Sequence, residues 1–367
     1  MHNKKAIFGA IIIILSGLFL YFFTSNDAWL YHQEIGQVIK VKNGKAIPTE
    51  DSFQNKDETT EQILTLKILN GKYKGKKVIV KNQFSKSGAY DQQYFAGQQI
   101  FLNLHHGKKK AITAQISHYK RDTYLIMLIW LVVVLLYLTM HLSGLRALLS
   151  VALNFVIFLF FVQMDVTYDF TNFFWIFAAS ALLFTGLSLV LVIGWNKQCW
   201  VSFLSIVFGT TIALGLGIGI LNLTGNSGIH YEALDFATQE PQQLFLSATV
   251  IGLLGAVMDA STDIVSTLFE LKRKQPNISA KQLFKSGQDV GRAIMGPLIN
   301  VLLMIFFAET FAIAVLYLRS GNTYGYTFEW SMALGITQAL ISGIGITLVI
   351  PSASFLCSRF LGRKEAK

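Results

Sequence analysis

Charged residues and cysteines are both scarce in this sequence. Only 14% of the 367 residues are Asp, Glu, Lys or Arg, whereas a soluble domain carries roughly 25%. The two cysteines, Cys199 and Cys357, are too few for the disulfide framework of a secreted scaffold, and no metal-ligand pattern surrounds them. The composition therefore excludes a disulfide-stapled domain, and we predict neither a metal site nor a cofactor.

The segments that lack charged residues are long runs of apolar residues. Hydrophobic residues make up 53% of the chain, and they gather in blocks of about 18–25 residues, the length that crosses roughly 30 Å of hydrocarbon. We therefore predict a polytopic α-helical membrane protein with about eight transmembrane helices. The predicted spans are residues 6–23, 124–142, 147–163, 173–193, 200–221, 244–268, 293–318 and 331–356. The first run is too long for a signal peptide and lacks a small-x-small cleavage site, so residues 1–27 are expected to be an uncleaved anchor.

The placement of Lys and Arg predicts the orientation. The formal net charge of +10 would fit nucleic acid, but the basic residues follow membrane topology, because Lys and Arg favour cytoplasmic loops. With the amino terminus inside, fourteen of the 31 Lys and Arg are cytoplasmic, Arg319 alone lies in a short outer loop, and sixteen lie between the first two spans. Long translocated segments largely escape the rule. We expect a multi-pass cell-membrane protein with both termini cytoplasmic, the lipid bilayer as a partner and no nucleic acid.

Residues 28–121 are expected to form an extracytoplasmic, β-rich domain between the first two helices. Turn-forming pairs such as Asn43-Gly44 and Asn70-Gly71 separate five β-like runs. Five short strands at this spacing predict a small barrel or sandwich. From Asp27 to Asp122, sixteen Lys and Arg stand against nine Asp and Glu, which fits either attraction to an external polyanion or an ordinary solvated surface. The runs are residues 34–41, 62–69, 76–81, 98–104 and 112–117.

Polar residues on the sixth predicted span are the strongest indication of function. Asp259, Asp263, Ser266 and Glu270 stand at i, i+4, i+7 and i+11, so they share one face of a helix, which Thr262 borders. A carboxylate at mid-helix costs roughly 2.5–3.5 kcal/mol in the membrane, so such residues normally face a bundle interior or a cavity. Asp259 lies deepest without an evident basic partner and is easier to bury protonated, which makes it a candidate proton carrier.

The seventh predicted span supplies partners for this face. It runs antiparallel to the sixth, so Arg292 is expected at the depth of Asp263 and Glu270. Asn300 stands about 12 Å further in, near the depth of Asp259. These three residues have an equally good structural interpretation. Arg292 could form a salt bridge with Asp263 or Glu270 that only holds the two helices together.

Gly296-Pro297 is expected to interrupt the seventh helix. Proline removes a backbone hydrogen bond and frees the carbonyl of Ala293. Interrupted helices beside buried carboxylates recur at the ion and substrate sites of secondary transporters. Pro297 is therefore counted with the candidate pathway residues.

Glycine spacing and helix capping predict two further features. Gly215-x3-Gly219 in the fifth span is the pattern for close packing of membrane helices. The cytoplasmic loop, residues 269–291, contains the capping box Ser279-x-x-Gln282, which predicts a short surface helix. That helix would either dock a cytoplasmic partner or rest on lipid headgroups.

A motif runs through residues 252–309. It comprises Met258-Asp259, residues 261–263, Glu270-Leu271-Lys272, Pro276-Asn277, residues 285–287, Gly291-Arg292 and residues 294–296. In these positions the chain resembles the YibE/F-like membrane proteins, and the anchor, β-rich domain and seven-helix domain (residues 122–367) together resemble the longer, YibE-type member. Pro297-Leu298 departs from the small polar residues expected there. The resemblance implies a bacterial cell-membrane protein with a shorter YibF-like partner, and it supplies no function.

Two functions fit these residues, and neither is enzymatic. The first is a transporter or permease whose sixth and seventh spans line a polar pathway, with Asp259 and Asp263 binding a cation or proton. The second is a non-catalytic scaffold or accessory subunit that recruits partners through the outer domain and residues 269–291. An intramembrane protease is disfavoured, because a carboxylate dyad shares a proton between apposed groups and the seventh span has no facing aspartate at that depth.

Overall fold

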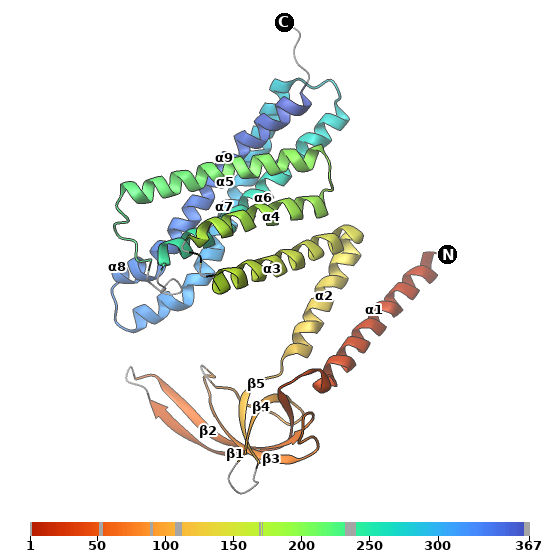
Figure 1. Cartoon of the computed structure of the whole chain (residues 1–367), viewed down its shortest axis with the longest axis vertical. Coiled ribbons are helices and arrows are strands. Elements are labelled where there is room, and N and C mark those ends of the chain that lie inside the picture. The colour runs from red at the N-terminus through yellow and green to blue at the C-terminus, as the bar shows by residue number, and fades with distance from the viewer. Residues whose placement is uncertain are drawn as a thin grey trace. The chain divides into compact units, whose positions relative to one another are not determined.

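The chain divides into two compact units, Met1–His141 and Leu142–Lys367. The computed structural model describes residues 2–50, 54–88, 91–106, 112–168, 170, 172–231 and 240–362. The first unit combines a β-sheet with two helices, α1 (His2–Ser25) and α2 (Asp122–Met140), and the described part of the second is helical (Figure 1). The division thus falls after α2, the helix with which the predicted seven-helix domain begins.

The first unit is built on a five-stranded antiparallel sheet in the order β3-β2-β1-β4-β5. Alternate residues of β2, Leu64, Leu66 and Ile68, are fully buried, because successive side chains of a strand point to opposite faces. The two edge strands, β3 and β5, contact each other. All five predicted strands are confirmed: β1 (Glu34–Glu50), β2 (Lys56–Ile68), β3 (Lys77–Ser85), β4 (Gln99–His106) and β5 (Ile112–Tyr119).

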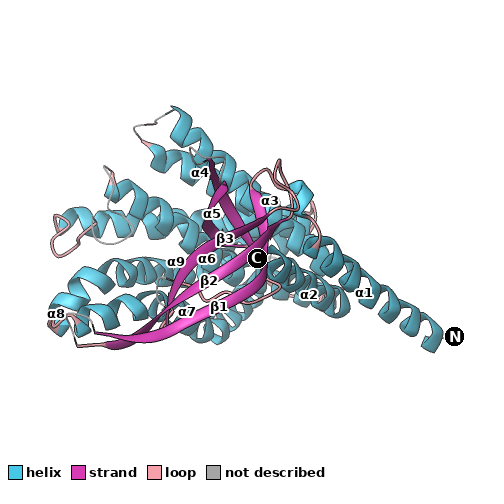
Figure 2. Ribbon diagram, turned by 90° about the horizontal axis from the view of Figure 1, so that it is seen from below, coloured by secondary structure: helices cyan, strands magenta, loops and turns pink. Residues whose placement is uncertain are grey.

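Strands β1 and β2 are much longer than predicted. Their ladder continues past the sheet to the pair Glu50↔Lys56, and Figure 2 shows the two strands twisting together as a long ribbon. The extra residues are mostly polar and exposed, so hydrophobic alternation could not reveal them.

The two helices of the first unit pack against each other. The indole Nε1 of Trp130 on α2 donates a hydrogen bond to the hydroxyl of Ser16 on α1 at 3.1 Å. Gly17 makes this approach possible, because a Cβ at that position would lie 2.8 Å from the Trp130 ring.

The second unit is a helical bundle centred on α6 and α9. Helix α6 packs against α4, α5, α7 and α9, and α9 also packs against α5 and α7. Their shared core includes Leu253, Val257, Ile346 and Val349, all with 0% exposure. The long helices are α3 (Leu142–Tyr168), α4 (Phe173–Val192), α5 (Lys197–Leu223), α6 (Pro241–Lys274), α7 (Ala280–Arg319) and α9 (Ala333–Leu361), and the short α8 (Tyr324–Thr327) joins α9 through a π-helical turn, Phe328–Met332.

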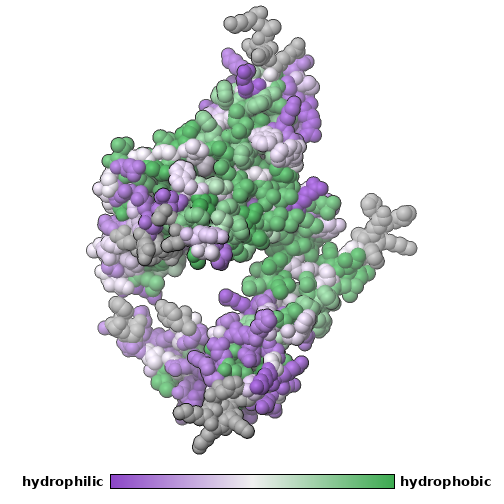
Figure 3. Space-filling view, viewed as in Figure 1, coloured by the Kyte–Doolittle hydropathy of each residue, from purple (hydrophilic) through white to green (hydrophobic). Residues whose placement is uncertain are grey.

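Seven helical segments in the described residues are long and apolar enough to cross a membrane. They match the second to eighth predicted spans, and the chain is a multi-pass membrane protein. The apolar stretch of α1 among the described side chains, Ile11–Ser25, is shorter. Figure 3 shows apolar surface over these helices and hydrophilic surface over the strands.

Helix α7 departs from the prediction in two ways. The capping box at Ser279 and Gln282 is present, but the helix it starts is not a separate surface helix, because α7 runs unbroken for 40 residues into the span. The predicted interruption at Gly296-Pro297 is also wrong, since Pro297 lies inside the continuous helix. The fixed φ of proline is compatible with a helix, although Pro297 has no backbone N–H to donate to the carbonyl of Ala293.

Candidate functional site: the polar face of α6

Helix α6 directs all its large apolar side chains into the bundle. Its buried face includes Leu253, Val257, Ile264 and Leu268, each with 0% exposure. These positions recur at helical spacing and so lie on one side. In α6, all of which the structure describes, no large hydrophobic side chain is exposed.

The opposite face of α6 is composed of small and polar residues. The predicted residues Asp259, Asp263 and Ser266 lie on it and are exposed, while Thr262 and Glu270 are half-buried at its edges. The exposed residues of α6 between its first turn and its basic end are Gly252, Gly255, Asp259, Asp263, Ser266 and Thr267. Every other long helix of the second unit exposes Leu, Ile, Val, Phe, Met or Trp side chains, as a lipid-facing surface requires. We call this face of α6 the polar face.

The carboxylates of Asp259 and Asp263 have no partner among the described residues. No hydrogen-bond donor and no cation of that part of the chain reaches either group. The Thr262 hydroxyl between them donates to the backbone carbonyls of Met258 at 2.9 Å and Asp259 at 3.1 Å. Its oxygen therefore keeps its lone pairs as acceptors at the edge of the polar face.

The remaining charges near the polar face pair within their own helices. Glu270 pairs with Arg273 at 2.5 Å and with Lys274 at 3.8 Å. Arg292 pairs with Asp289 at 3.8 Å, and its side chain is 77% exposed. The structure thus shows neither form of the α6–α7 salt bridge considered for Arg292 among the residues it describes. Pro297 and Asn300 are exposed on α7 as well.

Gln198, on α5, contacts the polar face of α6 and was not predicted from the sequence. Its side-chain amide, in the first turn of α5, donates to the Ser266 hydroxyl at 2.9 Å. The two residues are 68 positions apart, and a lone amide at a helix start carries no spacing signal. Asn196 caps the same helix by accepting from the Cys199 amide at 2.9 Å, which fixes the first turn and hence Gln198.

Close helix packing on α5 falls on other glycines than predicted. A Cβ at Gly215 or Gly219 would meet no atom within 4 Å. A Cβ at Gly217 would lie 2.8 Å from Ile341, and one at Gly209 would lie 3.2 Å from Val349. Helix α9 therefore approaches α5 along Gly209 and Gly217, on a different side of α5 from Gly215 and Gly219.

A second polar cluster lies in the first unit, where the strands join α1 and α2. The Lys120 side chain is 1% exposed, and its ammonium lies 2.8 Å from both Asp27 and Asp122. It also donates to the Thr24 carbonyl at 2.9 Å. The Tyr31 hydroxyl donates to Asp122 at 2.6 Å, and burial together with this carboxylate raises the pKa of Tyr31.

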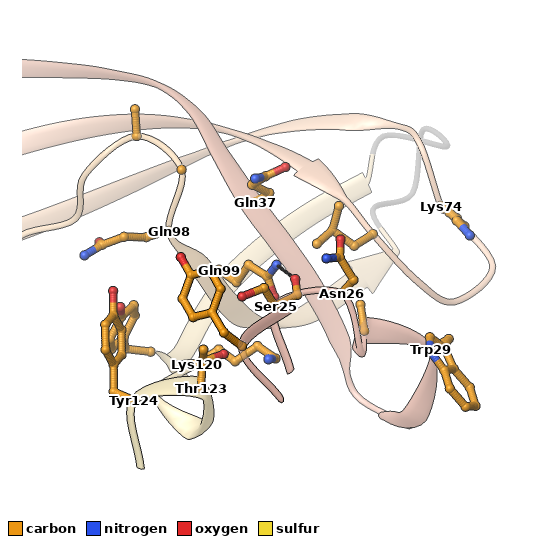
Figure 4. A pocket seen from close by; sticks show the side chains of 16 residues that line it. Ser25, Asn26, Trp29, Gln37, Lys74, Gln98, Gln99, Lys120, Thr123 and Tyr124 are labelled. Atoms are coloured by element: carbon orange, nitrogen blue, oxygen red, sulfur yellow. Dashed lines mark hydrogen bonds between the residues drawn. The ribbon is translucent and has the colours of Figure 1, made fainter. Parts of the chain in front are cut away.

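Lys120 of this cluster also lines a pocket of about 600 Å³. Figure 4 shows the hydrogen bond from Gln99 to the Ser25 carbonyl beside Lys120, with Trp29 and Lys74 at the other side of the view. Two carboxylates and the Thr24 carbonyl already accept from the three N–H groups of the Lys120 ammonium, so none is left to donate to a ligand. The cluster instead ties the sheet to both helices.

Comparisons with known sequences cover nearly all of this architecture. The family described as YibE/F-like protein matches residues 128–363, and the YibE/F family N-terminal domain matches residues 29–119. No curated protein and no solved structure matches the chain.

Proposed function

Because the chain belongs to the YibE/F-like family and crosses the membrane several times, we propose that it is a transport protein. In this proposal the polar face of α6 lines a pathway for a cation or a proton. One observation carries it: a helix of membrane-spanning length exposes glycines, hydroxyls and two carboxylates but no large apolar side chain.

The cost of placing a carboxylate in lipid indicates that water surrounds this face. Each carboxylate at the middle of a span costs roughly 2.5–3.5 kcal/mol, and such groups are tolerated where they line a water-filled cavity or meet a partner. Among the described residues, no cation and no hydrogen-bond donor pairs with the carboxylate of Asp259 or Asp263. A pathway containing water or an ion supplies what the bundle itself does not.

The chemistry of the face suits a hard cation or a proton. Asp259 and Asp263 stand one turn apart, with Cβ atoms about 5–6 Å from each other. Thr262, at the edge of the face, offers its hydroxyl oxygen as a further acceptor. Oxygen donors of this kind are preferred by hard cations. A carboxylate also takes up and releases a proton.

The proposal includes the orientation predicted from the basic residues. Helix α1 serves as an eighth span, both termini are cytoplasmic, and residues 28–121 are extracytoplasmic. The contact between edge strands β3 and β5 supports a barrel-like closure of the sheet in that outer domain.

The test is ion flux in membrane vesicles from cells that express the chain, followed with pH-sensitive and cation-sensitive dyes. We expect Asp259→Asn to abolish flux, since a neutral amide neither binds a cation strongly nor carries a proton. Glu309→Gln is the matched control, because Glu309 is another exposed carboxylate within a span but lies on α7, outside the polar face. Wild-type flux from Asp259→Asn at normal membrane levels would contradict the proposal.

The scaffold alternative is favoured by one feature, the exposed basic end of α6. Arg273 and Lys274 are exposed there, and they face the cytoplasm in the proposed orientation. A scaffold tolerates Asp259→Asn but loses partner binding when Arg273 and Lys274 are both changed to Gln. Pull-down from cells expressing each variant separates the two functions.

A further inference from the structure

The polar face of α6 is open among the described residues of the second unit. A Cβ at Gly255 would meet nothing within 4 Å, and Asp259 and Asp263 are exposed without partners in the described residues. Lipid tails offer no hydrogen bonds, so an unsatisfied carboxylate against them is strongly disfavoured. Something other than lipid must therefore cover this face.

The outer face of α7 is its chemical complement. Between Phe284 and Val301, α7 exposes no large hydrophobic side chain. Arg292 is held only by Asp289 at 3.8 Å on its own helix, and a Cβ at Gly296 would meet nothing within 4 Å. The residues exposed in this stretch are Lys285, Asp289, Arg292, Ala293, Gly296, Pro297 and Asn300.

We propose that a second copy of this chain covers the polar face of α6 with the outer face of its α7, and that two-fold symmetry makes the contact reciprocal. The inference rests on the proposed function, because the pathway then runs between the two copies. Symmetric dimers are the commonest oligomers, and the same patch then serves both subunits. One copy supplies carboxylates and the other supplies the cation and the amide.

Depth in the membrane supports this pairing. Both copies insert in the same orientation, so α6 of one copy and α7 of the other run antiparallel, as they do within one chain. Arg292 of the second copy then lies at the depth of Asp263, and Asn300, about 12 Å deeper, lies at the depth of Gly255, one turn beyond Asp259. The open glycines, Gly255 and Gly296, allow the two backbones to approach closely, as small residues do in membrane helix contacts.

Disulfide cross-linking between differently tagged chains tests the contact. Gly255→Cys is placed in one chain and Asn300→Cys, at the same depth, in the other, on a background in which the buried Cys199 and Cys357 are changed to Ala. Each chain carries a single cysteine, so any bond between tags is intermolecular. We expect a mixed dimer on mild oxidation of native membranes, because a disulfide forms only when Cα atoms come within about 7 Å.

The matched control is Gly215→Cys paired with Asn300→Cys. Gly215 is also an exposed helical glycine with open space around it, but it lies on α5, whose exposed face carries large apolar residues such as Leu216. We expect no cross-link from this pair. Equal cross-linking by both pairs, or none by either at normal membrane levels, overturns the second-copy proposal. An adduct of Gly255→Cys whose mass is not twice that of the chain identifies a different protein as the occupant and also overturns it.

Charge reversal provides an independent measurement. Asp263→Arg should reduce the cross-link at least tenfold, because it sets two cations against each other, and adding Arg292→Asp in both chains should restore it. Cross-linking needs no gradient or substrate. A cross-link in membranes where Asp259→Asn leaves flux unchanged therefore contradicts transport alone, and flux that depends on Asp259 without a cross-link contradicts the dimer alone.

Discussion

Changing Lys120 to Met should destabilise the junction between the sheet and its two helices far more than an equivalent change at the surface. Lys120 is 1% exposed and bridges Asp27, which is 5% exposed, to Asp122, each at 2.8 Å. Methionine keeps most of the side-chain length and removes the charge. Two carboxylates are then left together, one of them deeply buried, without a cation.

The magnitude follows from burial. Removing one partner of a buried ion pair typically costs about 3–5 kcal/mol, because the remaining charge is left uncompensated. The exposed pair Lys86–Glu58, at 3.6 Å with side chains 74% and 49% exposed, is worth at most about 1 kcal/mol. Lys86→Met in the same domain is therefore the matched control.

Hydrogen exchange of the full chain in lipid nanodiscs measures the difference. Amides of β1 and β4, which pair beside the cluster, should exchange about 10²- to 10⁴-fold faster in Lys120→Met, since each tenfold change in opening corresponds to about 1.4 kcal/mol. Lys86→Met should change exchange by less than about tenfold. Adding Asp27→Asn and Asp122→Asn to Lys120→Met should recover most of the protection, because no buried charge then lacks a partner.

Equal protection in Lys120→Met and Lys86→Met would refute this reasoning. It would mean that water reaches Asp27 and Asp122 freely enough to solvate them. A triple variant no more stable than Lys120→Met would refute the uncompensated-charge argument specifically and assign the loss to packing of the lysine stem.

Two further predictions concern helix packing and pH. Gly291→Ala should lower the stability of the bundle in detergent by about 1–3 kcal/mol, because its Cβ would collide with Ile350 on α9, whereas Gly215→Ala, facing open space, should be neutral or slightly stabilising. Unfolding midpoints measured by tryptophan fluorescence compare the two, and equal losses would contradict the packing geometry. The pKa of Tyr31 is raised by burial and by Asp122, so its stabilising effect is complete below the ordinary tyrosine pKa of about 10 and is lost as pH rises above it. Tyr31→Phe should remove that part of the alkaline destabilisation, and an unchanged pH profile would contradict the assignment.

Hydropathy predicted the membrane helices well because burial in lipid demands long apolar runs regardless of tertiary contacts. The strands were predicted where one face is buried, as at Leu64 and Leu66. They were missed in the β1–β2 ribbon, where pairing between Glu50 and Lys56 depends on the partner strand alone. Helix α7 was divided wrongly, since the charged residues after Ser279 resemble a surface helix and only the structure shows that they continue into the span.

In the candidate site, too, the features set by helical spacing were predictable from the sequence, and those set by contacts between helices were not. Spacing alone placed Asp259, Asp263 and Ser266 on one face of a helix, and the structure places them on one face. Depth alone suggested that Arg292 meets Asp263, but depth says nothing of rotation about the helix axis, and Arg292 turns outward to Asp289. Gln198 reaches Ser266 only because α5 packs beside α6, a contact that no periodicity encodes.

The direction of the polar face links the two proposals for this protein. A stripe of carboxylates that faced its own bundle core would need only a local partner, and a single chain would suffice. This stripe faces outward from a helix whose apolar side is already fully used by α4, α5, α7 and α9. Rotating α6 to hide Asp259 would expose Leu253 and Val257 and break the core they share with α9. The same packing that fixes α6 in place therefore leaves its polar face to be completed from outside the described part of the bundle.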